Sequence, residues 1–224
     1  MSSVDPGVPG LRERKKLRLR QEISDVATRL FAERGFEQVT LSEIAAAADV
    51  SVKTIFNHFG SKEDLYFDRS DELRAALVGA IAGRPPGITV LGALHALLTE
   101  NLVPFPGTPW TGLEDPAAYA RFRAFMATQD RSPALRARRL TLGEELVAEL
   151  AAVLAAELGR PAQDPATRAL AAMLGATLHL RDAVLRSAVA EEAPPQDLRP
   201  RVTATVDEAF RRLGAAFGDL DRPA

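Results

Sequence analysis

Apolar residues recur at the spacing of an α-helix in almost every long segment of this 224-residue chain, and no segment shows the strict alternation of a half-buried strand. A helical repeat leaves each segment with one apolar face, which must be buried against other helices. We therefore expect an all-α protein of about nine helices. Residues 14–34 show the pattern most fully, with apolar side chains at Ile23, Val26, Ala27, Leu30 and Phe31.

Residues typical of helix ends divide the first part of the chain into short segments. Gly35 can end the first helix, because glycine readily adopts the positive φ that such a position needs. Thr40 and Glu43 have the spacing of a capping box at the start of a second helix. Ser51 and Ser61 are suited to cap a third helix and a fourth. The expected later extents are about 51–59, 61–82, 88–103, 116–129, 132–158, 164–190 and 198–217.

Composition excludes several classes of function. The chain has no cysteine, so disulfides, thiolate catalysis and cysteine-ligated zinc are excluded. Its three histidines stand in no Glu-x-x-His or HExxH pattern, and no GxSxG or Walker loop occurs. We therefore expect neither an enzyme nor a bound cofactor or metal. No apolar run approaches the length of a membrane span or a signal sequence, which favours a cytoplasmic protein with no membrane partner.

Residues 40–59 have the pattern of a short helix, a tight turn and a second short helix, which is the geometry of a helix-turn-helix DNA reader. In the second helix, Ile55 and Phe59 lie four residues apart and can pack inward. A helix of two turns has no structural need to expose a phenylalanine beside an asparagine on its other face. A major groove would offer that face base edges and thymine methyl groups. The outward residues are Val52, Lys53, Phe56, Asn57 and, more laterally, His58.

Groups suited to phosphate contacts surround this helix, namely the side chains of Thr40, Thr54, His58 and Lys62. The overall net charge is −2, so any attraction to nucleic acid has to be local. By spacing alone, a charged helix face can equally be only solvated, and His58 can be a structural histidine. Residues 11–20 nevertheless carry six basic side chains against one acid, at Arg12, Arg14, Lys15, Lys16, Arg18 and Arg20.

A resemblance to the TetR family of bacterial transcriptional regulators is carried by the contiguous stretch ATRLFAERGFEQVTLSEIAAAADVSVKTIFNHFGSKEDL. Its most specific parts include Gly35-Phe36, Val50-Ser51, the run TIFNHF and the following Ser61-Lys62. The resemblance covers less than a quarter of the chain. It implies a helix-turn-helix DNA-binding domain over residues 1–66, with residues 1–13 as a disordered arm. It also implies an effector-binding and dimerisation domain over residues 67–224.

The resemblance further implies which side chains face DNA, although two positions depart from the family pattern. Asp49 stands where glycine is usual, and aspartate tolerates the left-handed region better than most residues. Phe56 stands where tyrosine is common, so its contact with DNA must be apolar. The implied base-facing residues are Ser42, Val52, Lys53, Phe56 and Asn57, and the implied phosphate-facing residues are Thr40, Thr54, His58 and Lys62.

An effector pocket is implied in the carboxy-terminal domain, and several aromatic and polar residues there could line it. Pockets are mostly apolar with a few polar groups that orient the ligand. The same residues could equally be plain core, because aromatic residues at helical spacing usually are. The candidates are His95, Phe105, Trp110, Tyr119, Phe122, Arg123, Met126 and His179.

A homodimer is implied through the last two helices, which carry more apolar residues than one core-facing stripe requires. Two such helices meeting their symmetry mates would form a four-helix interface. The alternative is that both helices are fully buried within one protomer. The candidate interface residues are Leu170, Leu174, Leu178, Val184, Val206, Phe210 and Leu213.

These expectations combine into one function. We expect a dimeric repressor that binds a palindromic double-stranded DNA operator and is released by a small-molecule effector, with the helix over residues 61–82 as the connecting lever. An activator, or a DNA-binding regulator without a small-molecule ligand, is the alternative. An all-α enzyme is disfavoured by the missing catalytic motifs.

Overall fold

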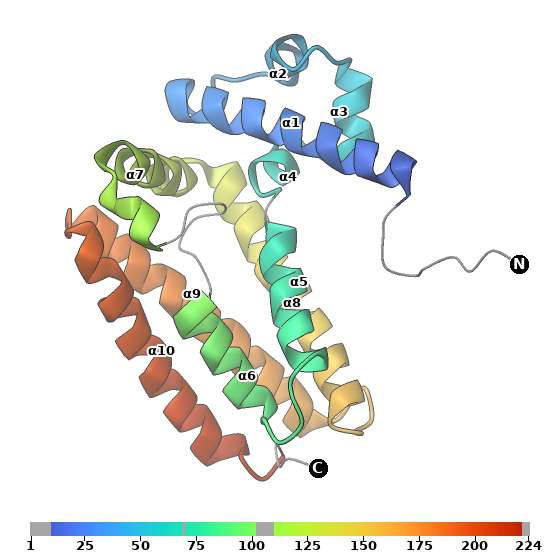
Figure 1. Ribbon diagram of the computed structural model, residues 1–224, viewed down its shortest axis with the longest axis vertical. Coiled ribbons are helices and arrows are strands. Elements are labelled where there is room, and N and C mark those ends of the chain that lie inside the picture. Colours follow the sequence, from blue (N-terminus) through green and yellow to red (C-terminus); the bar gives the residue numbers. More distant parts are fainter. Residues whose placement is uncertain (1–9, 69, 102–109, 221–224) are drawn as a thin grey trace, which may run out of the picture. The chain divides into compact units, whose positions relative to one another are not determined.

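The computed structural model describes residues 10–68, 70–101 and 110–220, which are helices and connecting turns with no strand among them. The expected all-α fold is confirmed. The chain divides into two compact units, Met1–Asp68 and Arg69–Ala224 (Figure 1). In the described ranges, no helix has the length and hydropathy needed to cross a membrane.

The first unit consists of α1 (Leu11–Arg34), α2 (Leu41–Ala47), α3 (Val52–His58) and α4 (Lys62–Tyr66). Its core includes three aromatic rings, with centroids 5.2 Å apart for Phe31 and Phe36 and 5.5 Å apart for Phe31 and Tyr66. Phe36 and Tyr66 meet edge to face at 5.6 Å. Such ring pairs stabilise by about 0.5–1.5 kcal/mol each beyond their burial. The rings are joined by the buried aliphatic side chains of Ile23, Ala27, Val39, Ile44, Ile55 and Leu65.

Side-chain caps start the short helices where the sequence predicts them. Thr40 and Glu43 make both bonds of a capping box at the start of α2. The hydroxyl of Ser51 accepts from the Thr54 amide at the start of α3, and Ser61 caps α4 in the same way. These caps matter because helices of five to seven residues are not stable alone.

Two turns of the first unit use a positive φ. Gly35, with φ of 83°, ends α1 and donates its amide hydrogen to the Phe31 carbonyl. Asp49 has φ of 52° in the turn between α2 and α3. An aspartate therefore does adopt the left-handed conformation at the position where the family pattern has glycine, at some cost in backbone energy.

The connecting helix over residues 61–82 is not continuous, which corrects the expectation of a single lever. α4 ends at Tyr66, and α5 spans Ser70–Ala82. The carboxylate of Asp68 lies in the break and accepts from Nε of Arg20 at 2.6 Å. An ion pair to α1 at this point holds the chain in a turn instead of letting the helix propagate. The basic stretch also differs from expectation, because residues 11–13 are helical and belong to α1.

The second unit contains α5, α6 (Val90–Ala96), a π-type turn η1 (Leu97–Asn101) and a 3₁₀ turn η2 (Trp110–Glu114). Four longer helices follow: α7 (Pro116–Arg131), α8 (Pro133–Glu157), α9 (Pro165–Ala190) and α10 (Pro195–Phe217). Each of these four has proline in its first turn, where no amide hydrogen is needed. The two η turns were not expected from the sequence.

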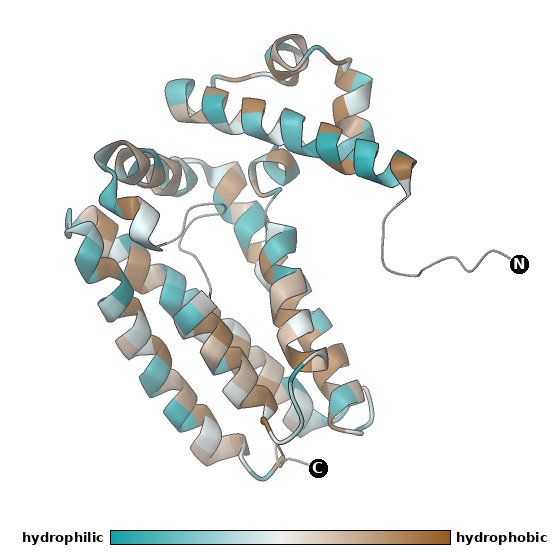
Figure 2. Cartoon of the chain, viewed as in Figure 1, coloured by the Kyte–Doolittle hydropathy of each residue, from teal (hydrophilic) through white to brown (hydrophobic). Residues whose placement is uncertain are grey.

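α9 is central to the second unit, because it packs on both α8 and α10 (Figure 1). The hydrophobic core runs from Leu77 on α5 through Leu94 on α6 and Phe122 on α7 to Leu213 on α10. Hydropathy colouring shows α6 as largely apolar and α1 as mostly hydrophilic (Figure 2). The second unit therefore holds the larger apolar interior of the two.

The turn at Asp49 gives a test of the local backbone energy. Asp49→Gly is expected to raise the free energy of unfolding by about 1 kcal/mol, because glycine adopts a positive φ without the steric penalty of a Cβ. The control is Ala46→Gly, at an exposed position inside α2, which should lower the same free energy by about 1 kcal/mol. Urea unfolding followed by circular dichroism measures both. A loss of stability in Asp49→Gly would contradict the assignment.

Candidate functional site

The helix-turn-helix of the first unit is fixed by the inward faces of its two short helices. Ile44 and Ala45 of α2 and Ile55 of α3 are buried, and Phe59 closes the end of α3. The amide of Val50 donates to the carbonyl of Ala45 at 2.9 Å, which holds the turn between them. With one face of α3 used for packing, its other face is left for solvent or a ligand.

The outward face of α3 carries the side chains that the sequence singles out. Lys53, Phe56 and Asn57 are exposed and Val52 is half-buried, while Ser42 is exposed on α2. Phe56 has 54% of its surface exposed, so it is not part of the core. A helix with an ammonium, an amide and an aromatic ring on one face can meet base edges and thymine methyl groups in a major groove.

The groups expected to meet phosphates have different surroundings. The hydroxyl of Thr40 lies in the capping box with Glu43 and is exposed. The hydroxyls of Thr54 and Ser51 are hydrogen-bonded at 2.8 Å. Hydrogen bonds from Thr40 and from Arg34 lower the pKa of Glu43 to about 2, so its carboxylate stays charged through the ordinary pH range.

His58 is half-buried, and its Nδ1 is buried without a hydrogen-bond partner in the described part of the chain. Burial lowers the pKa of this imidazole below 6.5, and the positive charges of Lys16 and Arg20 lower it further. The neutral ring is therefore favoured near pH 7. It can act as a hydrogen-bonding group toward a phosphate, but the free protein does not present it as a cation.

Lys62 is used inside the first unit. Its Nζ donates to the carbonyls of Phe36 at 3.0 Å and Val39 at 3.2 Å, and it lies 4.1 Å from the centre of the Phe36 ring. Both carbonyls belong to buried residues of the loop between α1 and α2. An ammonium with these partners has little freedom to reach a phosphate, so we reassign Lys62 to a structural role.

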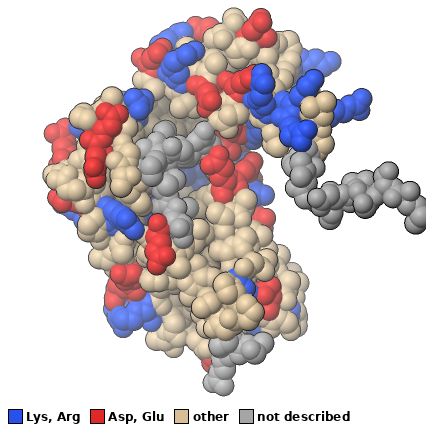
Figure 3. Space-filling model, in the orientation of Figure 1, with Lys and Arg blue, Asp and Glu red and all other residues tan. Residues whose placement is uncertain are grey.

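The basic stretch at the start of α1 separates into two groups. Arg14, Lys15 and Lys16 are exposed, and Lys and Arg side chains gather at this end of α1 (Figure 3). Arg18 pairs with Glu22 at 2.9 Å on the helix surface. The exposed members suit a salt-dependent attraction to a phosphate backbone.

Arg20, the last residue of the basic stretch 11–20, has a structural role and is not a free phosphate-binding group. Its guanidinium binds the Asp68 carboxylate and the His58 carbonyl, and lies 4.4 Å from the centre of the Phe59 ring. One side chain thus ties α1 to the end of α3 and to the turn after α4. The sequence could have indicated this role, because Arg20 precedes the buried residues Ile23 and Ala27 by three and seven positions and so lies on the same face of α1.

In the second unit, the candidate effector residues do not form one group. Phe122 and Met126 are buried in the core, as the plain-core alternative holds. The Tyr119 hydroxyl donates to the Ala193 carbonyl at 2.6 Å, and Arg123 pairs with Glu192 at 2.6 Å.

The remaining candidates are also separate. His95 pairs with Asp207 at 2.7 Å and packs on Phe210 with ring centroids 5.3 Å apart. Trp110 is half-buried and His179 is exposed. Phe105 lies outside the described residues.

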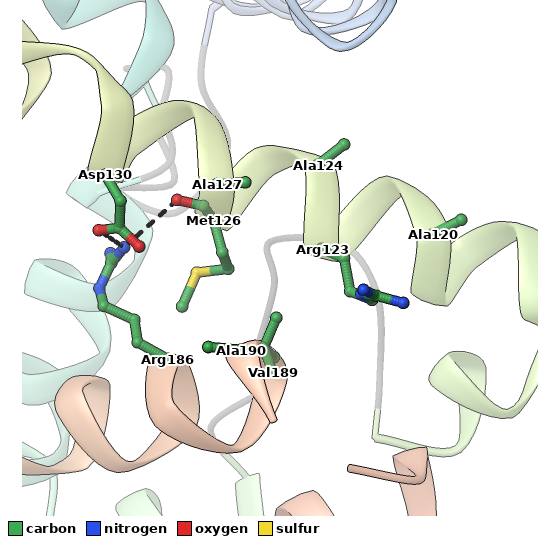
Figure 4. A pocket seen from close by; sticks show the side chains of 9 residues that line it. All are labelled: Ala120, Arg123, Ala124, Met126, Ala127, Asp130, Arg186, Val189 and Ala190. Carbon is green, nitrogen blue, oxygen red and sulfur yellow. Dashed lines mark hydrogen bonds and ion pairs between the residues drawn. The ribbon is translucent and has the colours of Figure 1, made fainter. Parts of the chain in front are cut away.

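One surface pocket, of about 380 Å³, lies between α7 and α9. It contains two of the candidates, Arg123 and Met126, and no others from that set. Arg186 reaches across it to Asp130, with Nη1 and Oδ1 2.7 Å apart (Figure 4). Since both arginines already have carboxylate partners, this pocket offers no free charge to a ligand. Its full lining is Ala120, Arg123, Ala124, Met126, Ala127, Asp130, Arg186, Val189 and Ala190.

A second pocket, a groove of about 680 Å³, runs between α9 and α10 with a mostly apolar lining. Met173 and Leu180, at its edge, are 51% and 46% exposed. Of the seven residues expected at a dimer interface, one, Leu213, lines this groove. Leu178 and Val184 are partly buried. Five of the seven are buried inside the protomer, which does not fit the expectation that they form its surface: Leu170, Leu174, Val206, Phe210 and Leu213.

Comparison with known proteins agrees with this geometry. Residues 23–68 match the family model described as bacterial regulatory proteins, tetR family. The chain is 33% identical over 154 residues to the transcriptional regulator TcmR of Streptomyces glaucescens, covering 69% of this chain and 66% of the relative. It is 34% identical over 87 residues to the transcriptional repressor KstR2 of Rhodococcus jostii strain RHA1, covering 37% of this chain. The alignments span just under two thirds of TcmR and 41% of KstR2.

Among solved structures, the fold is similar to a protein described as the SmeT–triclosan complex, with a TM-score of 0.55 and 19% identity. The similarity covers 87% of this chain and 91% of that one. At this identity the comparison concerns the fold alone.

The reassignment of Lys62 can be tested by stability. Lys62→Met is expected to lower the free energy of unfolding by about 1–3 kcal/mol, because the carbonyls of the buried residues Phe36 and Val39 lose the Lys62 ammonium as a donor. Lys53→Met is the matched control, since Lys53 is exposed on α3 and its change should stay within about 0.5 kcal/mol. Urea unfolding measures both, and equal midpoints for the two variants would refute the structural role.

Proposed function

The chain belongs to the TetR family of bacterial regulatory proteins, and we propose that it is a repressor that binds a palindromic operator as a homodimer and is released by a small-molecule effector. The observation that carries the proposal is the outward face of α3, where Phe56 is 54% exposed between Lys53 and Asn57. Its relatives are transcriptional regulators, several of them named repressors. The cytoplasm, where chromosomal DNA lies in bacteria, is the proposed place of action.

On DNA, α3 would lie in the major groove and read sequence. Lys53 and Asn57 would hydrogen-bond base edges, and Phe56 would pack on a thymine methyl group, since it has no hydroxyl to donate. Val52 and Ser42 would contribute at the edges of this contact. The base-reading role rests on exposure and helix geometry, because the inward face of α3 is already used for packing.

Phosphate contacts would position the reader without adding sequence information. Thr40, Thr54 and the neutral imidazole of His58 would take the phosphates beside α3. The exposed start of α1, with Arg14, Lys15 and Lys16, would add a salt-dependent attraction to the backbone.

The homodimer would form through α9 and α10. The groove between these helices exposes apolar side chains such as Met173 and Leu180, which are costly to leave in water over a large area. A two-fold axis through this face would place two readers on successive half-sites, one helical turn or a multiple apart.

Release would follow from a difference in effector affinity between two conformations. A ligand that binds better to the conformation whose half-site spacing does not fit the operator lowers the affinity for DNA by the same coupling free energy. The apolar interior of the second unit is the proposed ligand domain. The solved structure of similar fold is described as a complex with triclosan, so this fold can hold a small molecule.

Residues that read bases and residues that contact phosphates can be distinguished by DNA binding. Lys53→Ala is expected to lose about 1–3 kcal/mol of discrimination between the selected operator and a mutated one. Lys15→Ala should weaken binding to all sequences alike and reduce the salt slope by about one. Operators selected from genomic fragments and titrated at several salt concentrations provide the measurement. If Lys53→Ala weakens every sequence equally, Lys53 contacts phosphate instead of bases.

The dimer can be tested with a charge in the groove. Leu180→Glu is expected to weaken self-association at least about tenfold, because an interface would have to bury an unpaired carboxylate. The matched control is Leu140→Glu, at a leucine on α8 that is 61% exposed and lies outside the groove. Sedimentation velocity over a concentration series measures both. A Leu180→Glu protein that stays dimeric at the same concentrations as Leu140→Glu would exclude this surface.

A further inference from the structure

Arg181 occupies a core position of α9. The buried residues of this helix recur at intervals of three and four, and Arg181 continues the stripe formed by Leu174, Thr177, Leu185 and Ala188. Only 8% of its surface is exposed. A guanidinium thus stands at a position where helical spacing calls for an apolar side chain.

Two nitrogens of the buried guanidinium lack acceptors. Nε and Nη2 of Arg181 are buried and have no hydrogen-bond partner among the residues that the structure describes. Burial lowers its pKa to about 10, which still leaves it charged at neutral pH. Buried charges in proteins are normally paired, because leaving one unpaired costs several kcal/mol. The site is therefore energetically unfavourable as it stands.

Neighbouring charges do not supply the missing partner. The adjacent carboxylate of Asp182 accepts from Arg139 at 3.1 Å and from Arg186 at 2.8 Å. Arg186 in turn binds Asp130 at 2.7 Å and Gln129 at 2.5 Å. These five charged side chains, three arginines and two aspartates, leave a net charge of +1. Arg186, five residues further along the same helix, has acceptors, which Nε and Nη2 of Arg181 lack.

We propose that Arg181 anchors the acid group of the effector, which we identify as an apolar carboxylic acid. A guanidinium offers two parallel donors to a carboxylate, and the buried leucines of the same stripe of α9, Leu174 and Leu185, suit an apolar body. The local excess of one positive charge matches a monoanion. This inference rests on the proposed function, since it names the chemical class of the effector.

The first test is the stability of the free protein. Arg181→Met keeps the length of the side chain and removes the unpaired charge, so the thermal unfolding midpoint should rise by about 2–4 °C. Arg186→Met is the matched control on the same helix, and its midpoint should fall, because Asp130 and the buried Gln129 lose their partner. A lower midpoint in Arg181→Met would show a structural arginine and overturn the proposal.

The second test uses acids and their neutral counterparts as probes. 2-Naphthoate and decanoate are compared with 2-naphthamide and decanamide by thermal shift and by calorimetric titration. The wild-type protein should bind at least one acid about tenfold or more tighter than its amide, and Arg181→Met should lose that preference. Equal binding of acid and amide by the wild type, no binding of either acid, or a preference that survives in Arg181→Met would each overturn it.

A third measurement separates this inference from the proposed function. Operator binding by the wild type and Arg181→Met, without probe, reports only on DNA recognition, and both should bind equally. Absence of binding in both would refute the repressor while leaving the acid-binding result intact. Normal DNA binding together with a failed acid test would refute the role of Arg181 and leave the repressor standing.

Discussion

The first unit depends on the contacts of one guanidinium. Arg20 reaches from α1 to the Asp68 carboxylate, the His58 carbonyl and the face of the Phe59 ring. The carbonyl belongs to the last residue of α3, so the charge also satisfies a helix end that would otherwise lack a donor. These contacts link α1 to the end of α3 and to the turn at Asp68 that follows α4. The outward face of α3 is therefore set by a residue that does not lie on it.

Basic residues of this chain serve three purposes that their type does not reveal. Arg20 and Lys62 hold carbonyls and carboxylates within the first unit. Lys53 and the start of α1 stay exposed, where they are available to a nucleic acid. Arg181 is buried, and its Nε and Nη2 have no acceptor among the described residues, a state that calls for an explanation in a native protein. Burial and partners, not residue type, separate these roles.

Local signals predicted most of the fold. Thr40 with Glu43, Ser51 and Ser61 mark helix starts because each cap needs only its own next three residues. Asp49 could be placed in a turn for the same reason. The break after Tyr66 was missed, because it depends on an ion pair between residues 48 positions apart. A cap is a local device, whereas this turn is held by tertiary contact.

The sequence by itself determined most of the helices, the caps of the short ones and the residues on the outer face of α3, since helical periodicity and capping act over a few residues. Only the tertiary structure decided which charged and apolar side chains are already engaged. It showed that the Lys62 ammonium is held by carbonyls of the loop between α1 and α2, and that Leu170 and Phe210 lie in the interior. It also revealed the missing acceptors of Arg181. The reason is that hydrogen-bond partners and side-chain burial depend on contacts between segments distant in sequence, which a local sequence pattern does not reveal.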